Sequence, residues 1–226
     1  MIDPAIIQYY DRLALTYDVE RFGHSYGQFI DAQERAILGR LLPPSATRVL
    51  DIGCGTGRLS SFATHGCDAS VESLKVARSK VERGFVGGDA TGLPFDAGAF
   101  DAAFSFHLLM HLEPATIATL LREAGRVLKP GGVFIADIPS GLRRRLRPRR
   151  DSGWHGATSL TMAQFRDLAA PAGLTLRTIA GIALTPVHRI PYRLRGALAR
   201  IDARLAGLAP ACASYMVGCF VKERRT

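Results

Sequence analysis

The sequence predicts a three-layer α/β fold in which helices cover both faces of a mostly parallel sheet. Short apolar segments rich in β-branched residues alternate with amphipathic helical segments, which is typical of strand–helix–strand units. One apolar segment, residues 47–53, leads directly into glycines at positions 53, 55 and 57. Because the 226 residues contain no internal repeat, we expect a single domain over residues 1–226.

The first 42 residues are expected to form two helices. In the first, apolar and aromatic side chains recur at helical spacing, namely Ile6, Tyr9, Tyr10, Leu13 and Tyr17. The second runs from about residue 27 to residue 42 and ends at Pro43-Pro44. Beyond the glycines, residues 70–83 are expected to form a helix capped by Ser70.

The second half of the chain continues the alternation. Residues 114–129 form a clear amphipathic pattern with a proline in the first turn, and Pro130-Gly131-Gly132 is expected to stop this helix. The expected strands are 84–90, 100–109, 131–139, 174–182 and 213–224, and the further expected helices are 161–173 and 190–208. We expect the last strand to be antiparallel and the basic helix 190–208 to be an insertion before it.

Composition restricts the class of protein. The chain is 47% hydrophobic, but no apolar run approaches the roughly 20 residues that span a bilayer. Because the N-terminal segment lacks the pattern of a secretory signal, we expect a cytoplasmic protein. The four cysteines form no CxxC pair and no cluster with histidine, so no metal site is expected.

The net charge of +9 is concentrated late in the chain, in residues 142–150 and 188–204. Such a local excess attracts an anionic ligand, an acidic partner, nucleic acid or an anionic membrane surface. A solvated loop explains it equally well.

The most informative motif is Val49–Gly57, a strand that runs into three glycines. Glycine allows a sharp turn and a close approach of the backbone to a ligand, as in a nucleotide-binding loop. A dinucleotide fingerprint requires glycine at position 58, where this chain has Arg58, which disfavours NAD. Asp51, just before the turn, is suited to an ammonium group of a ligand.

These features, and the order of later motifs, resemble the class I, Rossmann-like SAM-dependent methyltransferases, in particular the small-molecule group that includes the ubiquinone and menaquinone methyltransferases. The resemblance implies S-adenosyl-L-methionine (SAM) as cofactor, S-adenosyl-L-homocysteine (SAH) as product, and a lid over residues 1–42. Asp68 falls where the family binds the ribose hydroxyls, and Asp89 where it receives the adenine amino group. The other residues that the resemblance places at SAM are Tyr17, Arg21, Asp51, Gly53, Cys54, Gly55, Gly57, Ala69, Ala90 and Phe106.

Few residues separate Gly57 from Asp68, against about 20 in the related dinucleotide fingerprint. We therefore expect an abbreviated helix and strand between them. Asp68 has an alternative role as N-cap of the following helix, and the two roles are compatible.

The resemblance also implies in-line transfer of a methyl group, in which the protein aligns the reactants and excludes water. Because an acceptor hydroxyl must lose a proton, a histidine base is expected, and the candidates beside the methyl group are His107 and His111. His107 is our first choice, the alternative being that it only lines the pocket; for His111, a packing role or a contact with SAM is favoured over catalysis. His155, beside Trp154, fits either an acceptor lid or a surface loop.

The expected acceptor is a small molecule or lipid-like compound, methylated at oxygen. Nucleic acid is not expected, because residues 105–107 lack the Asn/Asp-Pro-Pro-Tyr pattern of base-amine methylation and the arginines of 143–150 lack interleaved aromatic residues. By resemblance, 139–161 and 188–208 cover the acceptor. Their arginines suit an anionic or carrier-bound acceptor, and the basic helix also fits a peripheral membrane contact.

Three other interpretations are compatible with the sequence: an RNA or protein methyltransferase, a nonenzymatic SAM-binding module, and a nicotinamide oxidoreductase. A divalent ion is not expected, because residues 134–161 contain only Asp137 and Asp151 as acids. No feature predicts an oligomeric state.

Overall fold

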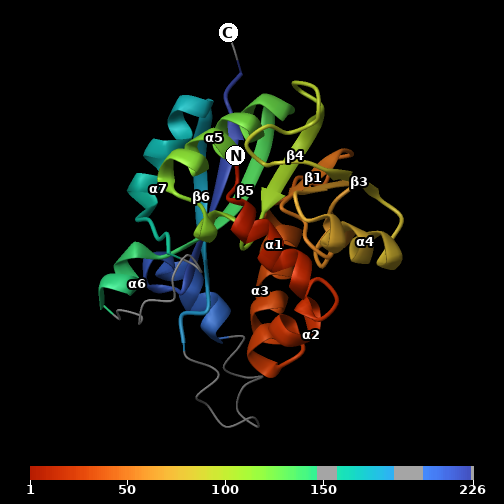
Figure 1. The fold of residues 1–226 in the computed structure, drawn as a ribbon. Helices are drawn as coiled ribbons and strands as arrows, with labels where there is room; N and C mark the ends of the chain where they lie inside the picture. The colour runs from red at the N-terminus through yellow and green to blue at the C-terminus, as the bar shows by residue number, and fades with distance from the viewer. Residues whose placement is uncertain (147–156, 186–200, 225–226) are drawn as a thin grey trace.

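The computed structural model describes residues 1–146, 157–185 and 201–224. They form a seven-stranded sheet in the order β3-β2-β1-β4-β5-β7-β6, covered by helices (Figure 1). The strands are β1 (Val49–Ile52), β2 (His65–Asp68), β3 (Gly84–Gly87), β4 (Phe100–Ser105), β5 (Leu128–Pro139), β6 (Leu174–Ile182) and β7 (Tyr215–Lys222). Strands β1 to β5 pair in parallel, and β7 lies antiparallel between β5 and β6. The predicted mostly parallel sheet with an antiparallel last strand is confirmed.

Three N-terminal helices, instead of the expected two, lie near the carboxyl ends of the parallel strands (Figure 1). They are α1 (Pro4–Leu13), α2 (Tyr17–Phe22) and α3 (Ser25–Leu41). The side chain of His24 caps α3 by accepting a hydrogen bond from the amide of Gly27. Histidine is not among the favoured N-cap residues, so the cap itself was not predicted, although α3 begins within two residues of the expected start at residue 27.

The connection between β1 and β2 is a single 3-10 turn, η1 (Ser60–Phe62), which confirms the expected abbreviation. The hydroxyl of Thr64, the residue before β2, pairs with the first residue of β1, because it accepts from the amide of Val49 and donates to its carbonyl, both at 3.0 Å. The next helix, α4 (Val71–Lys80), begins at its predicted cap, Ser70.

The helix α5 (Pro114–Val127) ends two residues before the expected end at residue 129, and β5 starts at once. The strand continues through Gly131, whose φ of +80° fits the register shift in its pairing with β4. Glycine tolerates this conformation, so the Pro-Gly-Gly sequence marks a bulge within the strand.

Apolar side chains fill both faces of the sheet. On one face, α5 and α7 (Met162–Ala169) pack against β5 and β7 through Phe134, Phe165 and Phe220, all fully buried. On the other face, α3 packs Phe29, Ile30, Ile37 and Leu38 against β1, β4 and β5. The sheet is therefore buried on both sides, as parallel sheets require.

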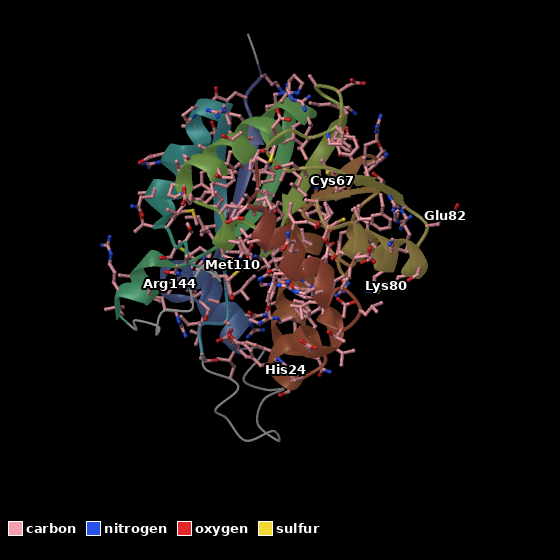
Figure 2. The ribbon with its side chains drawn as sticks, viewed as in Figure 1. His24, Cys67, Lys80, Glu82, Met110 and Arg144 are labelled. Carbon is pink, nitrogen blue, oxygen red and sulfur yellow. The ribbon has the colours of Figure 1, made fainter. Side chains whose placement is uncertain are left out.

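The arginine-rich segment begins as a short helix, α6 (Gly141–Leu146). Arg143 donates hydrogen bonds to the carbonyls of Leu184 and Cys212, at 2.8 and 2.7 Å, and Arg144 donates to the carbonyl of Ala157. These guanidinium groups thus fasten the surrounding connections together. In Figure 2, Arg144 lies at the edge of the molecule.

Of the expected basic helix 190–208, residues 201–208 are helical. Residues 190–200 of this helix lie outside the described ranges, as do His155, Trp154 and residues 147–150. The membrane contact assigned to the basic helix stays a prediction. No helix within the described ranges is long and apolar enough to cross a bilayer, and no group of at least three His, Cys, Asp or Glu residues there is arranged to hold a metal ion.

Replacement of Phe220 by alanine tests the packing between β7 and the helices. Phe220 is fully buried and its ring lies 5.0 Å from that of Phe165, so Phe220→Ala is expected to lower the free energy of unfolding by about 3–5 kcal/mol. Val71, 56% exposed, is the control, because Val71→Ala is expected to change stability by less than about 0.5 kcal/mol. Urea unfolding measures the free energy of unfolding of both variants. Equal losses of stability in the two would contradict the assignment of Phe220 to the core.

Candidate active site

The glycine turn, residues 53–57, follows β1 and contains three glycines with positive φ: Gly53 (+74°), Gly55 (+52°) and Gly57 (+75°). A Cβ at Gly53 would lie 2.8 Å from Cδ2 of Leu108, whereas a Cβ at Gly55 would meet no atom within 4 Å. Gly55 lines a cavity. The turn therefore leaves a bare stretch of backbone that a ligand can approach closely.

Asp51 lies on β1 at the same cavity and is 3% exposed. Burial raises the pKa of its carboxyl to about 8, against the opposing charge of Arg58. No described residue donates a hydrogen bond to this carboxylate. A cationic group of a ligand in the cavity would stabilise the charged form of this carboxyl.

Asp68, at the end of β2, holds the glycine turn from the neighbouring strand. One carboxylate oxygen accepts from the amide of Gly55 at 2.7 Å, and the other accepts from the amide of Ser70 at 2.8 Å. The cap of α4 is Ser70, whose hydroxyl accepts from the amide of Ser73. Asp68 thus does not take the alternative role of N-cap, and it lines the cavity.

Both carboxylate oxygens of Asp89 accept hydrogen bonds from other residues of the protein. One carboxylate oxygen accepts from the amide of Ile2, and the other from the amide and hydroxyl of Thr91, each at 2.8 Å. Asp89 is not among the residues that line the cavity, although its neighbour Ala90 is.

The first cavity, which contains the glycine turn, brings most of the predicted site residues together. It is lined by Tyr17, Asp51, Gly53, Cys54, Gly55, Asp68, Ala69, Ala90, Phe106, His107 and His111. Gly57, Arg21 and Asp89 do not line it. Its volume of about 100 Å³ is below the roughly 300–1,000 Å³ of most ligand sites. Ile2, Ile6 and Tyr10 from the N-terminal segment also line it, so a nucleotide-sized ligand would require these side chains to move.

A second cavity of about 360 Å³ adjoins the first, because Tyr10, Tyr17, His107 and His111 line both. Its wall is rich in rings and also carries one arginine: the residues found only there are Arg21, Phe22, His24, Tyr26, Gly27, Ile30, Met110 and Tyr215. Figure 2 shows Met110 near the centre of the molecule and Arg144 nearer its edge. Two adjoining cavities suit a reaction between two ligands.

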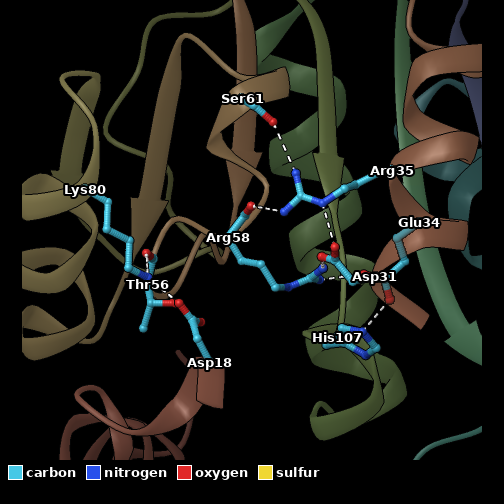
Figure 3. Close-up of polar contacts among 9 residues, drawn as sticks. All are labelled: Asp18, Asp31, Glu34, Arg35, Thr56, Arg58, Ser61, Lys80 and His107. Atoms are coloured by element: carbon cyan, nitrogen blue, oxygen red, sulfur yellow. Dashed lines mark hydrogen bonds and ion pairs between the residues drawn. The ribbon is translucent and has the colours of Figure 1, made fainter. Parts of the chain in front are cut away.

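The lid is fastened to the glycine turn through Asp18, the neighbour of Tyr17. Its carboxylate accepts a hydrogen bond from the hydroxyl of Thr56 at 2.6 Å and forms an ion pair with Lys80 (Figure 3). Lys80 also donates to the carbonyl of Thr56 at 2.9 Å. The resemblance assigned Tyr17 to SAM, but it gave no role to Thr56 or Lys80.

His107 lies directly after β4, on the wall that the two cavities share. Its Nε2 is 2.5 Å from Oε1 of Glu34, and Nδ1 is 3.7 Å from Oδ2 of Asp137. Burial lowers the pKa of the imidazole, but the carboxylates of Glu34 and Asp137 outweigh this effect, so that its pKa lies above the usual value. Burial raises the pKa of Asp137 to about 6, against the opposing charge of His107.

His111 contacts the lid, since its Nε2 lies 2.8 Å from the hydroxyl of Tyr10. Burial raises the pKa of that hydroxyl, so Tyr10 stays protonated at neutral pH. The contacts of Glu34 and Asp137 with His107 were not predicted, because these residues come from α3 and β5 and no motif contains them. Asp137 was considered only as a candidate ligand of a divalent ion.

Comparisons with known proteins agree with this geometry. The family model described as a methyltransferase domain matches residues 50–136. A demethylmenaquinone methyltransferase of Paenarthrobacter aurescens is 37% identical over 134 residues, which cover 56% of this chain and 51% of that protein. A malonyl-[acyl-carrier protein] O-methyltransferase of Erwinia pyrifoliae is 30% identical over 176 residues, which cover 73% of this chain and 66% of that protein.

The fold has matches among solved structures. A protein of Thermotoga maritima, described as a SAM-dependent methyltransferase and possible histamine N-methyltransferase, aligns over 96% of this chain and 99% of its own, with a TM-score of 0.71 and 19% identity. The chain spans about half the length of several curated relatives that it matches. The family model, the relatives and the fold agree, and the chain belongs to the class I SAM-dependent methyltransferases with a Rossmann-like fold.

Proposed function

We propose that this chain transfers the methyl group of SAM to an oxygen atom of a small-molecule or lipid-like acceptor. The observation that carries the proposal is Asp51, a buried carboxylate that lines the first cavity and receives no hydrogen bond from any described residue. The ammonium group of SAM is a fitting partner for it. When bound, SAM supplies an activated methyl group and is converted to SAH.

The glycine turn and its neighbours would hold the rest of the cofactor. Gly55 offers open space for a close approach, and Asp68 keeps lone pairs for the ribose hydroxyls while it accepts from Gly55. For Asp89 to receive the adenine amino group, the amide of Ile2 must release its carboxylate oxygen. The small volume of the first cavity and the hydrogen bond between Ile2 and Asp89 have the same implication. The N-terminal segment would move as SAM enters.

The second cavity is the proposed acceptor site. Its volume of about 360 Å³ lies within the usual range for small-molecule sites, and its aromatic wall suits a flat or apolar compound. Arg143 and Arg144 donate to backbone carbonyls, so we assign the attraction of an anionic or carrier-bound acceptor to Arg21, which lines this cavity. Two relatives act, by their names, on demethylmenaquinone and on malonyl-[acyl-carrier protein].

His107 is the proposed proton acceptor. It borders both cavities, which is where the acceptor oxygen must lose its proton as it is methylated. The rings of the lid and Tyr215 shield this position from water. The main work of the remaining residues is to align the two ligands.

The function is tested with SAM that carries a labelled methyl group, incubated with a cell extract and then separated into organic-soluble, small aqueous, protein and nucleic-acid fractions. Label in the organic or small aqueous fraction, absent with Asp51→Ala, supports the proposal. Label confined to RNA or protein would replace the proposed acceptor class. SAM binding without transfer from any extract would favour a nonenzymatic SAM-binding module.

Alanine at Gly55 is expected to weaken SAM binding by about tenfold or more, because a Cβ would occupy space reserved for the ligand. Gly98→Ala is the matched control: Gly98 also has a positive φ, of +70°, and open space around its Cβ, but it lines neither cavity. Both variants should lose about 1–2 kcal/mol of stability from backbone strain. Isothermal titration calorimetry measures the affinity, and equal affinities in the two variants would contradict the assignment of the turn.

The affinity for SAM is expected to rise with pH between about 6.5 and 8. The carboxyl of Asp51 has a pKa of about 8 in the free chain, so it is largely protonated at pH 7 and must lose this proton to pair with an ammonium group. The dissociation constant should fall by up to about tenfold per pH unit, and binding at pH 7 should release a proton.

Calorimetry in buffers of different ionisation enthalpy measures both the dissociation constant of SAM and the number of protons released on binding. Asp51→Asn should bind SAM weakly and without this pH dependence. Proton release that is unchanged in Asp51→Asn would show that another group titrates.

A further inference from the structure

Glu34 is a fully buried carboxylate to which the proposed function gives no role. It lies on α3 and contacts two groups. One oxygen, Oε2, accepts from the guanidinium of Arg58 at 2.5 Å, and the other, Oε1, lies 2.5 Å from Nε2 of His107 (Figure 3). A buried carboxylate is stable only when other groups compensate its charge. The charge of Glu34 therefore acts mainly on Arg58 and His107.

The position of the His107 ring is fixed from several sides. The residue has a φ of +59°, which is uncommon outside glycine, and its amide donates to Oδ1 of Asp137 at 2.7 Å. The rings of Phe22 and Tyr215 lie 6.0 and 5.4 Å from the imidazole, between ring centres. Packing therefore determines the position of the imidazole ring. The groups beside Nδ1 and Nε2 determine which of these two nitrogens carries the proton.

The two nitrogens have different surroundings. Nε2 is buried and lies against Glu34 in an ion-pair contact that is short but not well aligned as a hydrogen bond. Nδ1 is 3.7 Å from Oδ2 of Asp137, beyond hydrogen-bond distance. A carboxylate at Nε2 favours a proton on that nitrogen and leaves the lone pair on Nδ1.

We propose that Glu34 is the positioning residue of His107, holding the proton on Nε2 so that Nδ1 accepts the proton of the acceptor hydroxyl. This inference rests on the proposed function. The acceptor oxygen loses its proton to Nδ1 and forms a bond to the methyl carbon, while the electron pair of the carbon–sulfur bond returns to sulfur. The resulting imidazolium is paired with Glu34 until the proton passes to solvent.

Charged groups from three elements face His107, and together they set its proton affinity. They are Glu34 from α3, Asp137 from β5 and Arg58 from the segment after the glycine turn. Tyr17, Arg21 and His111 line the same second cavity. The two carboxylates favour the imidazolium and Arg58 opposes it, so removal of the charge of Glu34 lowers the pKa of His107.

The test is nuclear magnetic resonance of the full chain labelled with nitrogen-15 in its histidine rings, with His107 assigned by its loss in His107→Asn. In the wild-type chain, the ring above its pKa should show a protonated Nε2 and a bare Nδ1. In Glu34→Gln, His107 should titrate at lower pH. A wild-type ring protonated on Nδ1 would overturn the proposal, and this measurement needs no variant at Glu34 to fold.

Asp31→Asn is the matched control. Asp31 lies one turn earlier on α3 and also pairs with Arg58, but it does not contact His107. The titration of His107 should change little in Asp31→Asn. An equal shift in both variants, or no shift in Glu34→Gln, would contradict a specific role of Glu34.

Once an acceptor is identified, the pH profile of kcat at saturating SAM gives a second readout. The neutral base exists above the pKa of His107, so the acidic limb of the profile should move to lower pH in Glu34→Gln. A fall in kcat with an unmoved limb would indicate a merely structural role. Failure of the proposed function is distinct, since it shows as absence of methyl transfer by the wild-type chain whatever the state of the ring.

Discussion

The buried guanidinium of Arg58 joins the parts of the site. It follows the glycine turn directly, forms ion pairs with Asp31 and Glu34, and lies over the ring of Phe22, with 3.9 Å from its central carbon to the ring centre (Figure 3). Through these contacts the turn, α3 and the end of α2 are held in one arrangement. Loss of Glu34, its fully buried partner, is costly, about 3–5 kcal/mol, so the geometry of both cavities depends on this ion pair.

The contacts of Arg58 with α3 matter because the connection between β1 and β2 is short. A 3-10 turn stands where an abbreviated helix was expected, and α3 covers that face of the sheet near β1. Arg35 of α3 adds to the same junction by donating to the carbonyl of Arg58 at 2.7 Å. The N-terminal helices therefore contribute to the proposed cofactor site as well as covering it, and they are joined to the glycine turn through Asp18 and Thr56.

The sequence predicted the parts of the structure that depend on local patterns. Alternating strands and helices predicted the sheet, and the glycine motif located Asp51 and Gly55 at a cavity. The cap at His24 and the bulge at Gly131 were missed, because residue type alone does not distinguish them from a loop and a helix stop. Each depends on hydrogen bonds that become visible only in the folded chain.

The roles of Glu34 and Asp137 beside His107 were missed for a different reason. Their contacts with His107 join residues far apart in sequence, and no spacing rule connects α3 with β5. One indication was present: Glu34 lies in the apolar stripe of α3, between the buried Ile30 and Ile37. A charge in such a stripe requires a buried partner, which is a sign of a site even when the partner is not identifiable from sequence.

The central claim is that the cavity at the glycine turn is a SAM site completed by Asp51. A crystal structure of the chain grown with SAH tests it most directly. The account predicts the amino-acid ammonium of SAH within hydrogen-bond distance of the Asp51 carboxylate, the ligand against Gly55, and Ile2 displaced from Asp89. SAH bound elsewhere, or bound there with Asp51 in contact with water alone, would contradict it.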